Sequence, residues 1–305
     1  MKHNPPLLVI VGQTAVGKTD LSLKLAERFN GEIISADSRL FYKGMDIGTA
    51  KPSAEEQQRV PHHLIDVCAP DETLTLGDYQ SRANAMISDC YRRGKLPMLV
   101  GGTGQYVKAV VEGWGIPRVS PQPELRRELE KIGGPELGRW LAKLDPAASE
   151  KIDARNVRRV IRALEVTLVS GVPITHLQAK TPPEWNILTI GLFREREELY
   201  ARIDQRVDLM LANGLETEVR GLLAAGYGWK LPAMSGLGYR QFQPHFEGES
   251  TLDDVAERIK FETHRFSRQQ NNWFSRKDET IDWVEAAAPD LIEQVVIKVE
   301  SLLAV

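Results

Sequence analysis

The chain has 305 residues, of which 42% are hydrophobic and 27% are charged, and its formal net charge is −3. This length and apolar content suffice for one large domain, or two smaller ones, with a true hydrophobic core. The weakly acidic balance excludes a general attraction to polyanions, so any nucleic-acid site must come from local clusters of basic residues.

The cysteines, the adjacent histidines and the first apolar run argue against further classes of protein. Cys68 and Cys90 lack metal-ligand spacing and are too few for a disulfide framework. His62 and His63 are adjacent, and on an extended segment they would point in opposite directions, which favours a structural role for at least one. The first apolar run, 7–11, ends at a glycine and is too short for a secretion signal or a membrane span. We therefore expect a soluble cytoplasmic protein with no membrane partner.

Strands and helices are predicted to alternate in the first part of the chain. Apolar runs at 7–11, 32–37 and 96–100 are typical of buried parallel strands. Helical spacing of apolar residues predicts helices over 19–29 and 77–93. Such alternation favours βαβ units and a parallel sheet covered on both faces.

The pattern changes after Trp114, where a linker-like stretch rich in proline begins. Residues 123–170 then predict helices without a convincing strand, and 186–193 predict a strand again. We interpret 116–185 as a helical insertion domain.

The remaining segments, 1–115 and 186–305, form the two parts of one α/β core in this interpretation, and 195–225 and 251–275 are expected to be mostly helical. The predicted fold class is a P-loop NTPase-like α/β parallel sheet with a helical insertion.

A phosphate-binding loop is predicted where the first strand meets the first helix. The sequence GQTAVGKT fits the pattern G-x-x-x-x-G-K-[ST] and comprises Gly12, Gln13, Thr14, Ala15, Val16, Gly17, Lys18 and Thr19. Its glycines let backbone N–H groups surround an anion, and the following helix N-terminus adds a favourable dipole. Lys18 supplies a positive charge, and the Thr19 hydroxyl can ligate Mg²⁺.

The carboxyl ends of the next two predicted strands differ from those of an NTPase motor. Such motors have a strand-end Asp that holds Mg²⁺, but 96–100 runs into Gly101 and Gly102. The best acidic strand end is Asp37, where a carboxylate suits a general base facing an acceptor substrate. The alternative is that Asp37 only caps the next element.

The glycine turn at 101–104 lies where open α/β sheets bind ligands, although it lacks the third glycine of a dinucleotide fingerprint. Thr103 and Gln105 can offer hydrogen bonds there. A plain strand-to-helix turn is an equally good interpretation.

Two predicted helices carry basic faces. Arginines share one face at Arg155, Arg158, Arg159 and Arg162, opposite the apolar Val157, Val160, Ile161 and Leu164. The helix near the C-terminus has an apolar stripe with basic and polar neighbours, namely Val255, Ile259, Phe266 and Trp273 beside Arg258, Arg265, Arg268, Gln269 and Asn272. Such faces favour a nucleic-acid backbone, and the alternative is an ordinary solvated surface.

Several motifs together resemble a known family. GQTAVGKT, DSRLFYKGMDIGTAKP, PHHLID, VGGTGQY, RRVIRALEV, GLGYRQF and RQQNNWF occur in the order seen in bacterial tRNA dimethylallyltransferases. The resemblance covers nearly the whole chain. It implies a P-loop core with a helical insertion, and transfer of a dimethylallyl group from dimethylallyl diphosphate to the exocyclic amine of the adenosine 3′ of the anticodon.

The resemblance also implies roles for single residues. The phosphate loop and Lys18 would hold the diphosphate, with Mg²⁺ on Thr19, and Arg220 would be a second cation on the leaving group. Asp37 would accept a proton from the amine, and Thr103 would orient the reaction channel.

The tRNA anticodon loop is the expected partner of a second set of residues. By resemblance it would contact Asp37, Ser38, Arg39, Leu40, Arg158, Arg159, Val160, Ile161, Arg162, Ser235, Gly236, Leu237, Gly238, Tyr239 and Arg240. The second glycine turn adds Thr103 and Gln105, and the last basic face adds Arg265 and Arg268. Leu40 stands where many members have Gln. We expect a monomer.

Three other functions fit parts of the pattern. An ATP-dependent small-molecule kinase also uses a P-loop followed by a strand-end Asp, but it would need an Arg-rich lid. An adenylate (cytokinin-type) isopentenyltransferase would act on free nucleotides, whereas the GMDIGTAKP run and the basic helices favour tRNA. A non-catalytic RNA-binding P-loop protein would have no need of Asp37.

Overall fold

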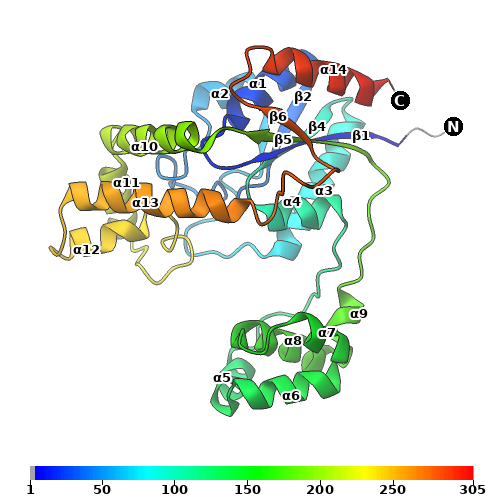
Figure 1. The fold of residues 1–305 in the computed structure, drawn as a ribbon. Helices are drawn as coiled ribbons and strands as arrows, with labels where there is room; N and C mark the ends of the chain where they lie inside the picture. Colours follow the sequence, from blue (N-terminus) through cyan, green and yellow to red (C-terminus); the bar gives the residue numbers. More distant parts are fainter. Residues whose placement is uncertain (1–3, 305) are drawn as a thin grey trace. The chain divides into compact units, whose positions relative to one another are not determined.

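The computed structural model describes residues 4–304 (Figure 1). The chain divides into two compact units. The core unit is built from 1–110 and 184–305, and the insertion unit is Val111–Pro183. No helix among the described residues is long and apolar enough to cross a membrane.

The core unit is built on a six-stranded sheet in which every strand pair is parallel, in the order β3-β2-β4-β1-β5-β6. The strands are β1 (Pro6–Gly12), β2 (Gly31–Ser35), β3 (His62–His63), β4 (Leu96–Gly101), β5 (Asn186–Phe193) and β6 (Asp282–Glu285). β1 lies between β4 and β5, with Val9 opposite Leu99 and Thr189. Because the central strands are covered on both faces, their sequences are continuous apolar runs. The predicted α/β fold class is confirmed.

Helices cover the sheet of the core unit. They are α1 (Lys18–Phe29), α2 (Ala54–Arg59), α3 (Leu76–Arg92), α4 (Gly104–Val111), α10 (Arg196–Ala212), α11 (Leu215–Ala224), α12 (Gln243–Phe246), α13 (Leu252–Gln270) and α14 (Leu291–Leu303), with a 3-10 turn η1 (Arg240–Phe242). α1 and α14 pack on one face of the sheet with Leu199 and Ile203 of α10 (Figure 1). Capping boxes at Thr75 and Thr251 begin α3 and α13. β3, β6 and α14 were not predicted, and the two strands are too short to show a period.

The described residues of the insertion unit form helices and loops, with no strand. It contains α5 (Pro123–Ile132), α6 (Gly134–Leu144), α7 (Pro146–Lys151), α8 (Val157–Ser170) and α9 (Ile174–Leu177). Its small core includes Leu137, Leu141 and Leu164. Glu165 is buried within it and accepts hydrogen bonds from both Arg126 and Arg162.

The structure corrects the predicted basic face of this unit. Arg155 lies before α8 and pairs with Asp153, so it is not on the helix. Val160 and Ile161 are buried in the core of the unit, which removes their side chains from the predicted tRNA surface. Arg162 pairs with Glu165, whereas Arg158 and Arg159 are exposed and have no ion-pair partner among the described residues.

Candidate active site

The phosphate loop follows β1 at the carboxyl edge of the sheet. Gly12 has a φ of +149°, and a Cβ there would lie 2.7 Å from the Leu192 carbonyl oxygen, so the turn requires glycine. α1 begins at Lys18 with Gly17 as its N-cap, and no side chain caps the first-turn N–H groups. A helix N-terminus left uncapped behind a turned loop is a ready site for an anion.

Lys18 lies within this loop. Its Nζ donates to the carbonyl oxygens of Gly12, at 2.9 Å, and Gln13, at 2.8 Å. Burial lowers the pKa of Lys18 to about 8, an effect that the Asp37 carboxylate opposes and the Arg206 guanidinium strengthens. A bound anion would favour the charged form of this amine.

Two arginines of α10 complete the cationic side of the site. Arg202 Nε donates to the Ala15 carbonyl oxygen at 2.9 Å. Arg206 lines the cavity beside the loop, and burial lowers its pKa while Asp37 opposes that shift. Neither arginine was predicted as a site residue, although their i, i+4 spacing on a predicted helix indicates a shared face.

The second cation expected from the resemblance, Arg220, lies elsewhere in the core unit. It belongs to α11, donates to Glu216 at 2.6 Å and lies over the Phe246 ring, with its Cζ 4.8 Å from the ring centroid. It lines neither cavity at the phosphate loop. Arg206, and not Arg220, lines both of these cavities.

Asp37 lies just beyond the end of β2. Its Oδ1 accepts the Arg39 N–H at 2.9 Å, so this oxygen stabilises a local turn and does not cap the next helix, whose N-cap is Ser53. Its Oδ2 has no hydrogen-bond partner among the described residues. One oxygen thus fixes the carboxylate while the other stays available for chemistry.

The second glycine turn is packed against the Asp37 segment. A Cβ on Gly101 would lie 2.2 Å from the Ala36 carbonyl oxygen, so this contact requires glycine. Thr103 donates its N–H to the Ala36 carbonyl oxygen, and its hydroxyl oxygen accepts the Ser38 N–H, both at 3.2 Å. Thr103 therefore holds the backbone on both sides of Asp37.

Gln270, at the end of α13, joins the two glycine loops. Its Oε1 accepts the Thr14 N–H at 2.8 Å, and its Nε2 donates to the Gly102 carbonyl oxygen at 3.0 Å. The side chain is buried, so both bonds are shielded from water. The sequence offered no signal for this role, because the three partners are distant along the chain.

The GMDIGTAKP run forms an ordered loop. Glu218 accepts the N–H groups of Asp46, Ile47 and Gly48 at 2.8, 2.7 and 3.1 Å, and also the Tyr239 hydroxyl at 2.7 Å. The ammonium group of Lys51 is buried between two carboxylates and the Tyr42 carbonyl oxygen. These bonds position Thr49 at the site, where it lines both cavities.

Two cavities meet at Asp37, and residues of the core unit line both. The smaller, of about 340 Å³, contains the phosphate loop and Leu40. The larger, of about 1360 Å³, we call the acceptor cleft. Both are lined by Thr14, Ala15, Asp37, Thr49, Gly102, Arg206, Phe266 and Gln270. The carboxylate therefore separates a phosphate-binding space from a space for a second, bulkier substrate.

The acceptor cleft brings together many of the residues predicted to contact tRNA. These are Ser38, Arg39, Thr103, Gln105, Ser235, Leu237, Gly238, Arg240 and Arg265. Gly236, Tyr239 and Arg268 do not line it, and Tyr239 is buried beside Glu218. In the predicted apolar stripe only Val255 and Ile259 are buried, whereas Phe266 and Trp273 are exposed in the cleft.

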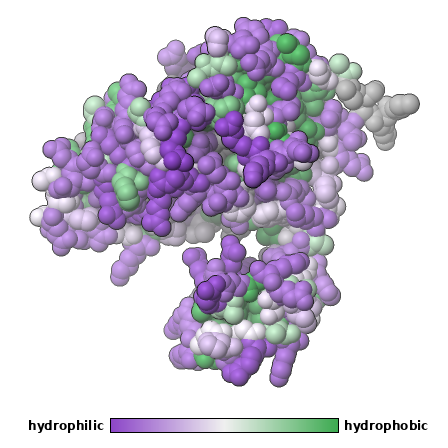
Figure 2. Space-filling model, viewed as in Figure 1, coloured by the Kyte–Doolittle hydropathy of each residue, from purple (hydrophilic) through white to green (hydrophobic). Residues whose placement is uncertain are grey.

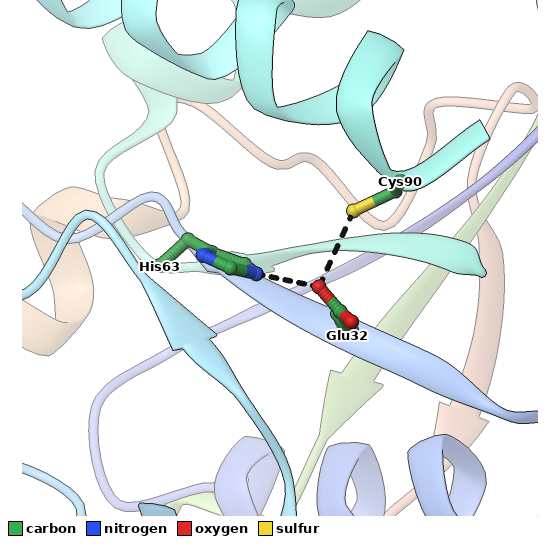
Figure 3. Close-up of side chains that lie close together, drawn as sticks. All are labelled: Glu32, His63 and Cys90. Atoms are coloured by element: carbon green, nitrogen blue, oxygen red, sulfur yellow. Dashed lines mark hydrogen bonds and ion pairs between the residues drawn. The ribbon is translucent and has the colours of Figure 1, made fainter. Parts of the chain in front are cut away.

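A separate cluster in the core unit has the residue types of a metal site. His63 Nε2 lies 2.7 Å and Cys90 Sγ 3.8 Å from Oε2 of Glu32 (Figure 3). However, Arg93 donates to both oxygens of Glu32 and holds the pKa of that carboxyl at about 2, against the effect of burial. Burial raises the pKa of the Cys90 thiol to about 11. Because Arg93 already balances the charge of the Glu32 carboxylate and the Cys90 thiol is protonated, the cluster is an ion-pair network.

Comparison with known proteins identifies relatives across the whole chain. The family model described as IPP transferase matches residues 40–277. A tRNA dimethylallyltransferase of Roseiflexus castenholzii is 54% identical over 95% of each chain, and one of Chloroflexus aggregans is 56% identical over 91% of this chain and 95% of its own.

Solved structures agree with these sequence relatives. The tRNA isopentenylpyrophosphate transferase of Bacillus halodurans has a TM-score of 0.74 and 38% identity, covering 98% of this chain and 97% of its own. A eukaryotic dimethylallyltransferase acting on tRNA has a TM-score of 0.86 and 27% identity, covering 97% of this chain and 79% of its own.

Proposed function

This chain belongs to the IPP transferase family, and from that membership we propose that it transfers a dimethylallyl group from dimethylallyl diphosphate to tRNA. The acceptor is the exocyclic amine of the adenosine 3′ of the anticodon, and diphosphate is released. The observation that carries the mechanism is the position of Asp37, which lines both the phosphate-loop cavity and the acceptor cleft.

The leaving group is the diphosphate. The phosphate loop, Lys18 and Arg206 hold it, and their positive charge stabilises the negative charge that develops when the bond between its oxygen and the prenyl carbon breaks. Arg202 fixes the loop through the Ala15 carbonyl oxygen. Arg220 has no part in this step.

The acceptor amine loses a proton as it attacks. The new bond joins the amine nitrogen to the prenyl carbon, and Oδ2 of Asp37 takes the proton. An exocyclic amine of adenine is a poor nucleophile, so removal of the proton accompanies the attack. Thr103 and Arg39 hold the turn that aims the carboxylate.

Mg²⁺ is the metal that the phosphate-loop cavity suits. Thr19, Asp20, Ser35 and Asp37 line this cavity, and oxygen donors of these types are the ligands that Mg²⁺ prefers. When bound beside Thr19, the ion would neutralise part of the diphosphate charge.

The adenosine enters the acceptor cleft after leaving its stack in the anticodon loop. Gly238 and Arg240 line this cleft, and Phe266 and Trp273 offer exposed aromatic surface. Arg158 and Arg159 of the insertion unit contact the RNA backbone. The enzyme acts as a monomer, which light scattering with and without tRNA would test.

The test incubates the protein with labelled dimethylallyl diphosphate, Mg²⁺ and unmodified tRNA. We expect label in the tRNA without added ATP. A strict need for ATP would indicate a kinase, and label in free AMP alone would indicate an adenylate isopentenyltransferase. RNA binding without transfer of label would indicate a non-catalytic RNA-binding protein.

A further inference from the structure

A third cleft of the core unit opens on the other side of the phosphate loop, and we call it the side cleft. It has a volume of about 420 Å³ and lies between Gly12–Gln13, the end of β5 and the segment after α13. We propose that it binds a backbone phosphate of the RNA substrate, an inference that rests on the proposed function. Its cations are Arg194, Arg196, Arg268, Arg276 and Lys277.

The charges of the side cleft are not balanced. Glu195 is the single acid among its lining residues. Arg194 forms an ion pair with Glu198. Within residues 4–304, the other four cations, Arg196, Arg268, Arg276 and Lys277, have no carboxylate within ion-pair distance, although 42 acidic residues are present in the chain. These four like charges repel one another, and a bound anion would relieve that repulsion.

Three of the guanidinium groups are already held in place by the protein. Arg194 donates to the carbonyl oxygens of Val16 and Ala286, at 3.0 and 2.9 Å. Arg268 donates to the Tyr200 hydroxyl at 2.6 Å. The Cζ of Arg276 lies 3.7 Å from the centroid of the Phe193 ring. Side chains on an ordinary solvated surface are not fixed in this way, and fixing them beforehand lowers the entropic cost of binding. Guanidinium groups also match the geometry of phosphate oxygens.

The surroundings favour an RNA backbone over a free nucleotide. Arg276 covers one face of the Phe193 ring, so that face offers no stacking surface for a base. Arg265 lines the acceptor cleft and Arg268 the side cleft, and the two are three residues apart on α13, a rise of about 4.5 Å. A strand that leaves the acceptor cleft over α13 therefore meets the side cleft within a nucleotide or two. Hydrophilic residues predominate on the face of the core unit seen in Figure 2.

The experiment measures binding of unmodified tRNA across a series of salt concentrations. The variant is Arg276→Ala combined with Lys277→Ala, and the matched control is Lys24→Ala, which removes an exposed cation on α1. We expect the double variant to bind tRNA about tenfold more weakly and to lose about 1 from the slope of log K against log salt per lost phosphate contact. The loss should appear in KM for tRNA rather than in kcat or in KM for the diphosphate.

Three results would contradict the proposal that the side cleft binds an RNA phosphate. They are tRNA affinity and salt slope equal to those of Lys24→Ala, a rise in KM for the diphosphate donor instead, or loss of inorganic phosphate binding with tRNA binding unchanged. Thermal unfolding of each variant checks that it is folded. Failure of the wild-type protein to transfer label to tRNA would contradict the proposed function, whereas wild-type transfer with an unaffected double variant would contradict only this site.

Discussion

Two groups of arginines in this protein have opposite environments. In the insertion unit, Arg126 and Arg162 surround the buried Glu165. Burial alone would raise the pKa of Glu165, but hydrogen bonds from Arg126, from the Gln122 N–H and from Arg162 outweigh it and lower that pKa to about 2. In the core unit, Arg206 lies beside Lys18, and Asp37 is the carboxylate that faces them.

The comparison shows how a structural cation differs from a functional one. A buried carboxylate at the centre of the first group satisfies its arginines and fixes helices α5 and α8 to each other. In the second group, Oδ2 of Asp37 has no hydrogen-bond partner in the part of the chain that the structure describes, so the positive charge of Lys18 and Arg206 stays available in the cavity. The cations of both groups lie on helices, so helical position does not distinguish the groups, and the position of the nearest acid decides the role.

The largest expected effect comes from the carboxylate of the second group. Asp37→Asn keeps the turn-forming oxygen but cannot accept the proton, so we expect kcat to fall by about 10²–10⁴. Binding of dimethylallyl diphosphate, measured by calorimetry, should stay within about twofold. Full activity of this variant would mean that another group is the base.

The second largest effect distinguishes Arg206 from Arg220 as the cation that stabilises the leaving group. Arg206→Ala should lower kcat by about 10² or more, because it removes charge from the leaving group. Arg220→Ala, at the position expected from the sequence, should change kcat by less than about threefold, since Arg220 lies on Glu216 and Phe246. Steady-state kinetics of both variants check this, and the reverse order would contradict the assignment.

Substitution in the group around Glu165 is expected to lower the stability of the protein rather than its activity. Glu165→Gln leaves two arginines without their carboxylate, and we expect a loss of about 2–4 kcal/mol in the free energy of unfolding, measured with urea. Arg155→Ala is the control, because its partner Asp153 is exposed, and it should leave the urea midpoint unchanged. Equal midpoints for both variants would show that Glu165 contributes nothing to stability.

The smallest expected effect is a loss of stability at acid pH. Glu165 and Glu32 both have folded-state pKa values of about 2, below the ordinary 4.5. Their stabilisation is therefore present above pH 4.5 and is lost as the pH falls from 4.5 towards 2. Urea midpoints measured down that range should decline, and more gently in Glu165→Gln than in wild type.

Much of the site was predictable because its signals are local in sequence. The phosphate loop, the strand that ends before Asp37 and the turn at Gly101–Gly104 each occupy one continuous segment. Backbone geometry couples such residues directly: a strand end fixes where the next few residues lie, and glycines mark where the chain must turn. The apolar runs likewise determined four of the six strands, because central strands are buried on both faces.

The tertiary structure alone decided which side chains meet. Gln270 joins Thr14 to Gly102 across sequence separations of 256 and 168 residues, and Arg206 rather than Arg220 lines the phosphate-loop cavity. Helical periodicity places arginines on a face but does not say what that face contacts. Packing between distant segments decides whether an arginine pairs with the buried Glu165 or is available to bind a phosphate. A local sequence pattern contains no information about that packing.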